Sequence, residues 1–305
     1  MLYRYFQSMI KGWVAVGGRS VVISAVLLPF FASTASGTDV DLGEYESMPA
    51  GTNVFVAYYK AFRHDAFYNN GARVSDNAQL DIDVAILRYV GFREWGERLI
   101  ALEAILPVAT YRTAGDFSAL GDVAGIGDLI VPLPVFLMNK PAERKYFAVS
   151  PVLHVPIGEY DKEKPLNIGE NRWKYEFQAG YVTAISNNWN LDATLGVTFF
   201  GDNTAFGPES LTLEQRPELK GQFHATYLGP NNSRYGLGLV HTAGGETKIA
   251  GVDQRNQKST TRLALSYARM LTPTDQILLS VGRDMSVDNG SKEEGRLTLR
   301  FMHLY

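Results

Sequence analysis

Alternation of apolar and polar side chains is the dominant pattern of the chain from Gly51 onward. It occurs in stretches of about 10 to 14 residues, each bounded by a turn signal, and Trp173–Ile185 and Trp189–Phe200 show it most regularly. Because successive side chains of a β-strand point to opposite faces, this period of two predicts strands with one apolar and one polar face. No stretch shows the period of a convincing amphipathic helix. The pattern therefore predicts an all-β protein.

The length, number and connections of these strands predict how they are arranged. Each is long enough for a tilted strand to cross a membrane. Twelve can be counted: 53–62, 78–90, 98–111, 128–137, 145–157, 173–185, 189–200, 218–228, 234–242, 259–270, 276–284 and 295–305. Five short connections alternate with six mostly longer ones, which is typical of an up-and-down barrel of the outer-membrane type with both termini on the periplasmic side. We expect a transmembrane antiparallel up-and-down β-barrel of about 12 strands.

One of the twelve stretches fits less well. Pro132 and Pro134 lie within 128–137, and proline cannot donate a hydrogen bond to a neighbouring strand. A secreted β-sandwich or a lipocalin-like barrel would also alternate, but such folds have about seven to nine strands of five or six residues. Twelve long strands favour the membrane barrel.

The terminal strand, Arg296–Tyr305, is expected to pair with 53–62 and close the barrel. Its Leu297, Leu299 and Phe301 row should face lipid and Arg300 the lumen, while His303 and Tyr305 should lie at the periplasmic rim. A terminal strand that ends in an aromatic residue resembles the strand by which the barrel-assembly machinery recognises such proteins. We therefore expect that machinery and outer-membrane lipid among the partners.

The amino-terminal segment has the features of a secretory signal. Arg4, Lys11 and Arg19 form a basic region, Val21–Phe31 is an eleven-residue apolar run, and small residues follow it. A membrane anchor is the alternative, but eleven residues would span only about half of a bilayer as a helix. We predict a signal peptide over 1–37, an outer-membrane barrel domain over 38–305, and a location in the bacterial outer membrane.

Composition narrows the function further. The absence of cysteine excludes disulfides, thiolate metal sites and cysteine nucleophiles. Without its first 37 residues the chain has 26 basic and 32 acidic residues, so nucleic acid is not an expected partner. No nucleotide fingerprint, phosphate loop or metal-ligand cluster is present, and we expect no cofactor and no metal.

Three glycine-containing motifs identify a family resemblance. They are Gly125-Ile126-Gly127-Asp128-Leu129, Pro156-Ile157-Gly158-Glu159-Tyr160 and Asn167-Ile168-Gly169-Glu170-Asn171-Arg172-Trp173. Together with PAGTNVFVAYY at the first strand, they resemble the transporters grouped under the name MetA-pathway of phenol degradation. The resemblance covers essentially the whole chain after the signal. It implies an outer-membrane barrel that moves small, often hydrophobic or aromatic, compounds.

The motif residues also have a local interpretation. We expect Asn171 and Gly169 to shape a turn, Trp173 to lie in the membrane interface, and Arg172 to lie near acidic loop residues or lipid phosphate. The loop acids Glu159, Asp161, Glu163 and Glu170 could bind a hard cation such as calcium, although a solvated acidic loop fits their spacing better.

The polar rows of the strands supply the candidate pore-lining residues. A twelve-stranded barrel has room for only a narrow pore, so these groups could fill the lumen, set its selectivity, or do both. The candidates are Asp81, Asp83, Glu103, His154, Lys174, Glu176, Gln178, Asp192, Glu218, Lys220, His224, Arg262 and Arg300.

Two functional alternatives remain beside a passive channel for small solutes. One is a non-transporting barrel with structural or surface-binding duties. The other is a lipid-acting hydrolase, in which His241 and Ser259 would lie opposite each other across a long loop. Neither an orienting acid nor an amide for such a pair is apparent, so we predict a channel rather than an enzyme.

Overall fold

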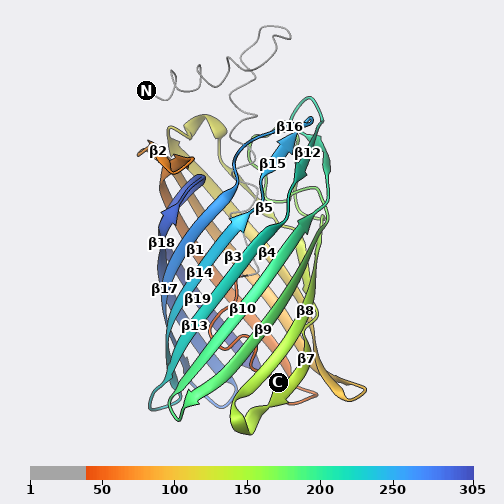
Figure 1. Cartoon of the computed structure of the whole chain (residues 1–305), viewed down its shortest axis with the longest axis vertical. Coiled ribbons are helices and arrows are strands. Elements are labelled where there is room, and N and C mark those ends of the chain that lie inside the picture. Colours follow the sequence, from red (N-terminus) through yellow and green to blue (C-terminus); the bar gives the residue numbers. More distant parts are fainter. Residues whose placement is uncertain (1–38) are drawn as a thin grey trace.

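A closed antiparallel β-barrel accounts for nearly the whole structure (Figure 1). The computed structural model describes residues 39–305, and the predicted signal peptide lies outside this range. The wall strands are β1 (Asn53–Asn69), β3 (Ala78–Trp95), β4 (Arg98–Gly115), β6 (Leu129–Pro132) with β7 (Val135–Lys140), β8 (Lys145–Val155), β9 (Lys174–Ser186), β10 (Trp189–Phe200), β13 (Glu218–Leu228), β14 (Ser233–Gly244), β17 (Lys258–Met270), β18 (Asp275–Val287) and β19 (Gly290–Leu304). Counting β6 and β7 as one interrupted strand, the predicted twelve-stranded barrel is confirmed.

Pairing of the first and last strands closes the wall. Val54 lies opposite Leu304 and Ala57 opposite Phe301, as the sequence predicted. His303 is at the short-turn end, where its Nδ1 is 2.7 Å from Asp275 Oδ1. Closure leaves no free sheet edge in the membrane.

Short turns gather at one end of the barrel and longer connections at the other (Figure 1). At the loop end, β11 (Asn203–Phe206), β12 (Leu211–Gln215), β15 (Thr247–Ile249) and β16 (Val252–Asp253) form a separate four-stranded sheet. The short strands β2 (Ala72–Ser75) and β5 (Val123–Ile126) extend the main sheet. No helix among residues 39–305 is long and apolar enough to cross a membrane.

Side chains are distributed as a membrane barrel requires. Leu195, Leu265 and Phe177 project outward and are each more than half exposed, whereas Glu176 and Asp192 project inward and are almost fully buried. Lipid gives the outward apolar row a suitable solvent. Along the short-turn end, Trp189, Tyr227, Tyr235 and Tyr267 stack side by side, with ring centroids 5.2 to 6.3 Å apart, and form part of an interfacial aromatic belt.

The lumen has two chemically different sides. Inward side chains of β1, β3, β4 and β8, among them Val54, Leu80, Ile82, Ile105 and Val152, belong to one buried apolar cluster. Inward side chains of β13, β17 and β19 are instead mainly charged or polar, as with Lys220, Arg262 and Arg300. Polar and apolar groups can therefore both find partners inside this barrel.

Candidate functional site

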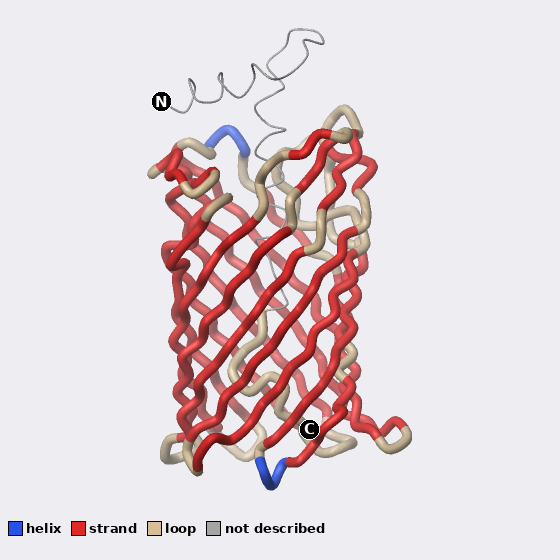
Figure 2. Tube along the Cα trace, in the orientation of Figure 1, coloured by secondary structure: helices blue, strands red, loops and turns tan. Residues whose placement is uncertain are grey.

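Residues 39–48, here called the lumen segment, lie inside the barrel. Figure 2 shows this stretch in tan within the ring of strands. It joins β1 through a fixed corner at the short-turn end, where the Gly51 N–H donates to the Phe92 carbonyl at 2.9 Å. Leu42 and Tyr45 of the segment are buried against the wall. The segment therefore occupies space through which a solute would pass.

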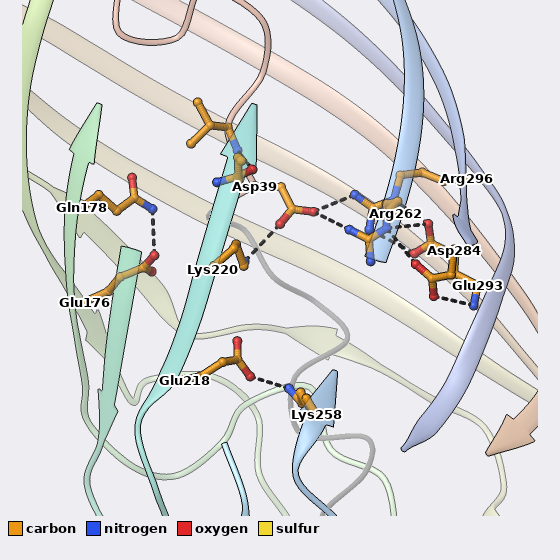
Figure 3. Close-up of polar contacts among 12 residues, drawn as sticks. Asp39, Glu176, Gln178, Glu218, Lys220, Lys258, Arg262, Asp284, Glu293 and Arg296 are labelled. Atoms are coloured by element: carbon orange, nitrogen blue, oxygen red, sulfur yellow. Dashed lines mark hydrogen bonds and ion pairs between the residues drawn. The ribbon is translucent and has the colours of Figure 1, made fainter. Parts of the chain in front are cut away.

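Four carboxylates bind the lumen segment to the wall. Asp39 contacts Lys220 at 3.0 Å, Arg262 at 3.1 Å and Arg296 at 2.6 Å, so one acid is held by cations from three strands (Figure 3). The other pairs are Asp41–Arg300 at 2.9 Å, Glu44–Arg88 and Glu46–Arg234 at 2.8 Å. Charged pairs in a low-dielectric interior interact more strongly than exposed ones, although desolvation opposes the gain.

Small wall residues make room for the segment. A Cβ at Gly180 would lie 2.2 Å from the Tyr45 ring, and a Cβ at Gly236 would lie 3.0 Å from Leu42 Cδ2. The Tyr45 hydroxyl also donates to Gln178 Oε1 at 2.8 Å. The wall is therefore shaped to fit these particular side chains.

The pKa of Asp39 makes this attachment sensitive to acid. Burial alone would raise the pKa, but the charges of Lys220, Arg296 and Arg262 outweigh burial and hold it well below the ordinary 3.8. A lowered pKa means that the stabilisation is complete above the ordinary value and is lost as the pH falls through the lowered one.

We expect a corresponding pH dependence of ion flow through the barrel. Single-channel current should stay constant from neutral pH down to the ordinary carboxyl pKa of 3.8 and should rise only as the pH falls further, toward the lowered pKa of Asp39, because protonation of Asp39 releases the segment. Planar-bilayer recordings at a series of pH values would measure this. Asp39→Asn should show raised current already at neutral pH, and a current that falls with acid in the unmodified protein would contradict the expectation.

A folded loop narrows the opposite end of the lumen. Asp128 accepts hydrogen bonds from the Gly158 N–H and the Glu170 N–H, each at 3.0 Å, and so joins all three glycine motifs. A Cβ at Gly169 would lie 2.6 Å from the Gly158 carbonyl carbon, so this close contact of two backbones requires glycine. The motifs that indicated the family thus fold residues 156–173 over the loop end of the barrel.

Glu170 pairs with both cations at the charged end of this loop. Glu170 contacts Arg172 at 2.7 Å and Lys174 at 2.5 Å, and Arg172 also stacks over the Phe200 ring at 4.7 Å. Burial would raise the pKa of Glu170, but Lys174 and Arg172 lower it to about 2. Arg172 is therefore near an acidic loop residue, as predicted, and not on the membrane side. Trp173 is exposed, which fits the predicted interface position.

Substitution of Gly169 tests the folded loop. Gly169→Ala should displace residues 158–172, because the added Cβ has no space beside Gly158. Tryptic cleavage after Lys162 in proteoliposomes should then become faster. Gly221→Ala is the control, since nothing lies within 4 Å of a Cβ at that position. Equal cleavage rates in the two variants would show that the contact does not hold the loop.

Two cavities remain in the lumen on either side of the Asp39 cluster. The outer cavity, about 110 Å³, lies beneath the folded loop and is lined by Ile130, Ile168, Phe200 and Lys220, among others. The inner cavity, about 150 Å³, is lined by the lumen segment, by residues of the apolar side and by the charged wall residues Arg88, Glu103, Arg234 and Arg300. Among residues 39–305 the two cavities share no lining residue, and the Asp39–Lys220 ion pair spans the boundary between them. A solute larger than an ion therefore needs this boundary to move.

Eleven of the thirteen predicted pore-lining residues face the interior. They are Glu103, His154, Lys174, Glu176, Gln178, Asp192, Glu218, Lys220, His224, Arg262 and Arg300. The prediction for Asp81 and Asp83 is wrong. Both face outward, because Leu80 and Ile82 fill the lumen instead. β3 carries them on its loop-end half, where Asp83 pairs with the exposed Arg112.

The structure does not bring together the two residues of the hydrolase alternative at the fifth long loop. Ser259 lies opposite Ala243, and His241 lies opposite Thr261, whose hydroxyl is 2.9 Å from His241 Nδ1. The register thus differs by two residues from the one that would pair His241 with Ser259. Among the described residues, no group of three or more acidic or histidine side chains could hold a metal ion.

The sequence did not identify the lumen segment as part of the site. Its signal was the run of four acids without a base between Asp39 and Glu46, just before the first strand. The complementary Arg88, Arg234 and Arg296 were not among the candidates, and Arg88 shares a strand face with Leu80 and Ile82. Which loop or terminus enters a lumen depends on long-range contacts that a strand pattern does not contain.

Known proteins similar to this chain include an outer membrane channel. The family model described as MetA-pathway of phenol degradation matches residues 63–301. The chain is similar to the COG4313 outer membrane channel from Pseudomonas putida F1, with 34% identity and a TM-score of 0.84 over 88% of this chain and 100% of that chain. No curated protein matches it.

More distant similarity concerns the fold alone. The transport unit of the autotransporter AIDA-I from Escherichia coli has 9% identity and a TM-score of 0.54, covering 91% of this chain and 96% of that chain. The beta domain of the Bordetella autotransporter Brka has 9% identity and a TM-score of 0.52, covering 84% of this chain and 100% of that chain. The extent of the family match and the identity to the Pseudomonas channel are decisive: this chain belongs to the MetA-pathway of phenol degradation family of outer-membrane barrels.

Proposed function

We propose that the protein is a passive outer-membrane channel for small molecules, including apolar and aromatic ones. The observation that carries the proposal is the pair of internal cavities, one toward each end of a closed barrel, separated by the Asp39 cluster of the lumen segment. A segment that is not part of the wall can move without opening the barrel. The 34% identical Pseudomonas protein is described as an outer membrane channel, which supports the same role.

The solute class follows from the two-sided lumen. The apolar side supplies a surface for carbon-rich solutes, since burying apolar area is favourable by about 25 cal/mol per Å². The charged side supplies hydrogen-bond partners for a polar substituent. A small ring with one polar group would fit both sides.

Export and assembly complete the proposal. Residues 1–37 would direct the chain across the inner membrane, and the mature domain would begin near residue 38. The barrel-assembly machinery would recognise the terminal strand, β19, and lipid would surround the outward apolar row.

Reconstitution tests the channel directly. Purified protein in planar bilayers should carry a small current, and proteoliposomes should swell in small solutes faster than empty liposomes. A barrel that passes neither ions nor solutes would contradict the channel and favour the structural or surface-binding alternative. Phospholipid turnover by the unmodified protein that is lost in His241→Ala would favour the hydrolase instead.

A further inference from the structure

The barrel wall is interrupted between β4 and the pair β6 and β7. Ladder pairs are present at Ile105–Ile130 and at Leu99–Phe136, and both belong to one register. Between them, the Ala101 N–H donates to the Pro134 carbonyl at 2.9 Å. On the other side of β4, by contrast, the register with β3 runs without a break from Ala78–Gly115 to Trp95–Arg98.

Prolines explain the interruption. A residue in an antiparallel strand directs its N–H and its carbonyl to the same neighbour, so the carbonyl of Ala101 faces Pro134, and by the same register that of Glu103 faces Pro132. Neither proline has an N–H to donate. Two successive pairs of the ladder therefore lack one of their two hydrogen bonds.

The next strand on that side is weakened in the same way. The Leu133 N–H donates to the Pro151 carbonyl at 3.0 Å, but Pro151 cannot return a hydrogen bond to Leu133. Every backbone polar group inside a bilayer needs a partner, so a wall with missing donors is the least stabilised part of a barrel. We call the gap between Ala101–Glu103 and Pro132–Pro134 the proline seam.

The inner cavity lies directly behind the proline seam. Its lining includes Glu103, Ile105, Pro132, Pro134 and Phe136 of the seam and the strands beside it. Its volume, about 150 Å³, is close to that of an engineered apolar protein cavity that binds benzene. On the other face of the wall, Leu102 is exposed to lipid. At this place the seam is the part of the wall that lies between the cavity and the hydrocarbon.

The lumen segment is connected to the seam through one arginine. Arg88 contacts Glu103 at 2.7 Å and also pairs with Glu44 of the segment. Displacement of the segment would remove one of the two acids that hold Arg88. A solute entering the inner cavity would therefore disturb the contacts behind the seam.

From these contacts we propose that the proline seam is a lateral exit, through which small apolar solutes pass from the inner cavity into the bilayer. The inference rests on the proposed channel function and adds the route and the solute class. An apolar molecule in the inner cavity gains by entering hydrocarbon, whereas its passage into water would be unfavourable. An ion cannot follow, because transfer of a charge into hydrocarbon is prohibitive.

A disulfide across the seam tests the exit. By the seam register Leu102 and Leu133 lie opposite each other, and side chains at such a pair are close enough for a disulfide. The chain has no cysteine, so Leu102→Cys/Leu133→Cys can form only this link within one molecule. Leu237→Cys/Leu265→Cys is the matched control, because these lipid-facing residues are partners in the uninterrupted β14–β17 ladder.

Two readouts separate the lateral route from the axial one. We would measure protein-dependent uptake of radiolabelled toluene by cells that carry each variant, and single-channel current of the same purified proteins in KCl. Oxidised Leu102→Cys/Leu133→Cys should lose most of the toluene uptake, keep its current, and recover uptake with reductant. The control should keep both. Unchanged uptake, or uptake and current that fall together, would overturn the lateral exit.

A second variant works without a crosslink. Pro132→Ala/Pro134→Ala would supply the two missing N–H donors to the carbonyls of Glu103 and Ala101, so toluene uptake should fall while the current stays. Uptake equal to that of the unmodified protein would overturn the exit, and this variant decides alone if the disulfide does not form. Absence of any current and any protein-dependent uptake in the unmodified protein would instead contradict the channel itself.

Discussion

Deletion of residues 39–48 should raise the single-channel conductance several-fold. The lumen segment lines the inner cavity, and its Asp39 pairs with Lys220 at the boundary with the outer cavity, so its removal would join the two into one continuous space. Pro49–Thr52 should be kept, because the Thr52 carbonyl accepts from the Phe92 N–H and fixes the start of β1. Planar-bilayer recordings of the deleted and complete proteins would measure the change.

The same deletion should also alter ion selectivity. The segment contributes four acids and no base, so its removal leaves Lys220, Arg296, Arg300 and the other cationic partners facing the lumen. Reversal potentials in a KCl gradient should shift toward anion selectivity. Full-length Asp39→Asn/Asp41→Asn serves as the control, and its ion selectivity should lie between those of the deleted and the complete protein. Conductance and selectivity equal to those of the complete protein would show that the segment does not limit flow.

Loss of Arg296 should cost about 3 to 5 kcal/mol of barrel stability, the range for breaking a buried charge pair by removing one partner. Arg296 contacts Glu293 at 2.7 Å and Asp39 at 2.6 Å, and it stacks over the Phe62 ring at 4.6 Å (Figure 3 shows the charged groups). Arg296→Met would leave Glu293 buried with Arg262 as its remaining cation, at 3.3 Å. Urea unfolding in lipid vesicles would measure the difference.

An exposed pair on the neighbouring strand provides the control for this measurement. Arg283 contacts Glu294 at 2.5 Å, but its side chain is 55% exposed. Arg283→Met should therefore change the stability by no more than about 1 kcal/mol. Equal losses for the two variants would mean that burial does not decide the strength of these pairs.

The wall of the barrel was largely predictable from the sequence because its solvent is uniform. Lipid accepts only apolar side chains, so the outward row of nearly every strand, such as that of β9 with Phe177 and that of β10 with Leu195, carries an unbroken signal. The pairing of β1 with β19 then followed from the requirement for closure. Even the weak stretch, 128–137, was marked by its prolines, and the structure divides it at that place into β6 and β7.

The interior was less predictable because inward side chains contact apolar partners on one side of the lumen and charged or polar partners on the other. Leu80 and Ile82 look like lipid-facing residues, yet they belong to an apolar cluster inside the lumen, while Asp81 and Asp83 face outward. The lumen segment has no strand pattern at all, and contacts such as those with Arg88, Arg234 and Arg300 place it. Such contacts join residues far apart in the chain, and no local pattern specifies them.

Movement of the lumen segment is the central requirement for flow through this barrel, and one crosslink tests it directly. A Cβ at Gly236 would lie 3.7 Å from Leu42 Cβ, which is the usual separation in a disulfide. Leu42→Cys/Gly236→Cys would therefore fix the segment to β14 in a protein that has no other cysteine. The measurement is the single-channel current of this one protein before and after addition of reductant. If the segment must move for flow, the oxidised protein carries much less current and reduction restores it; equal currents in the two states would contradict that claim.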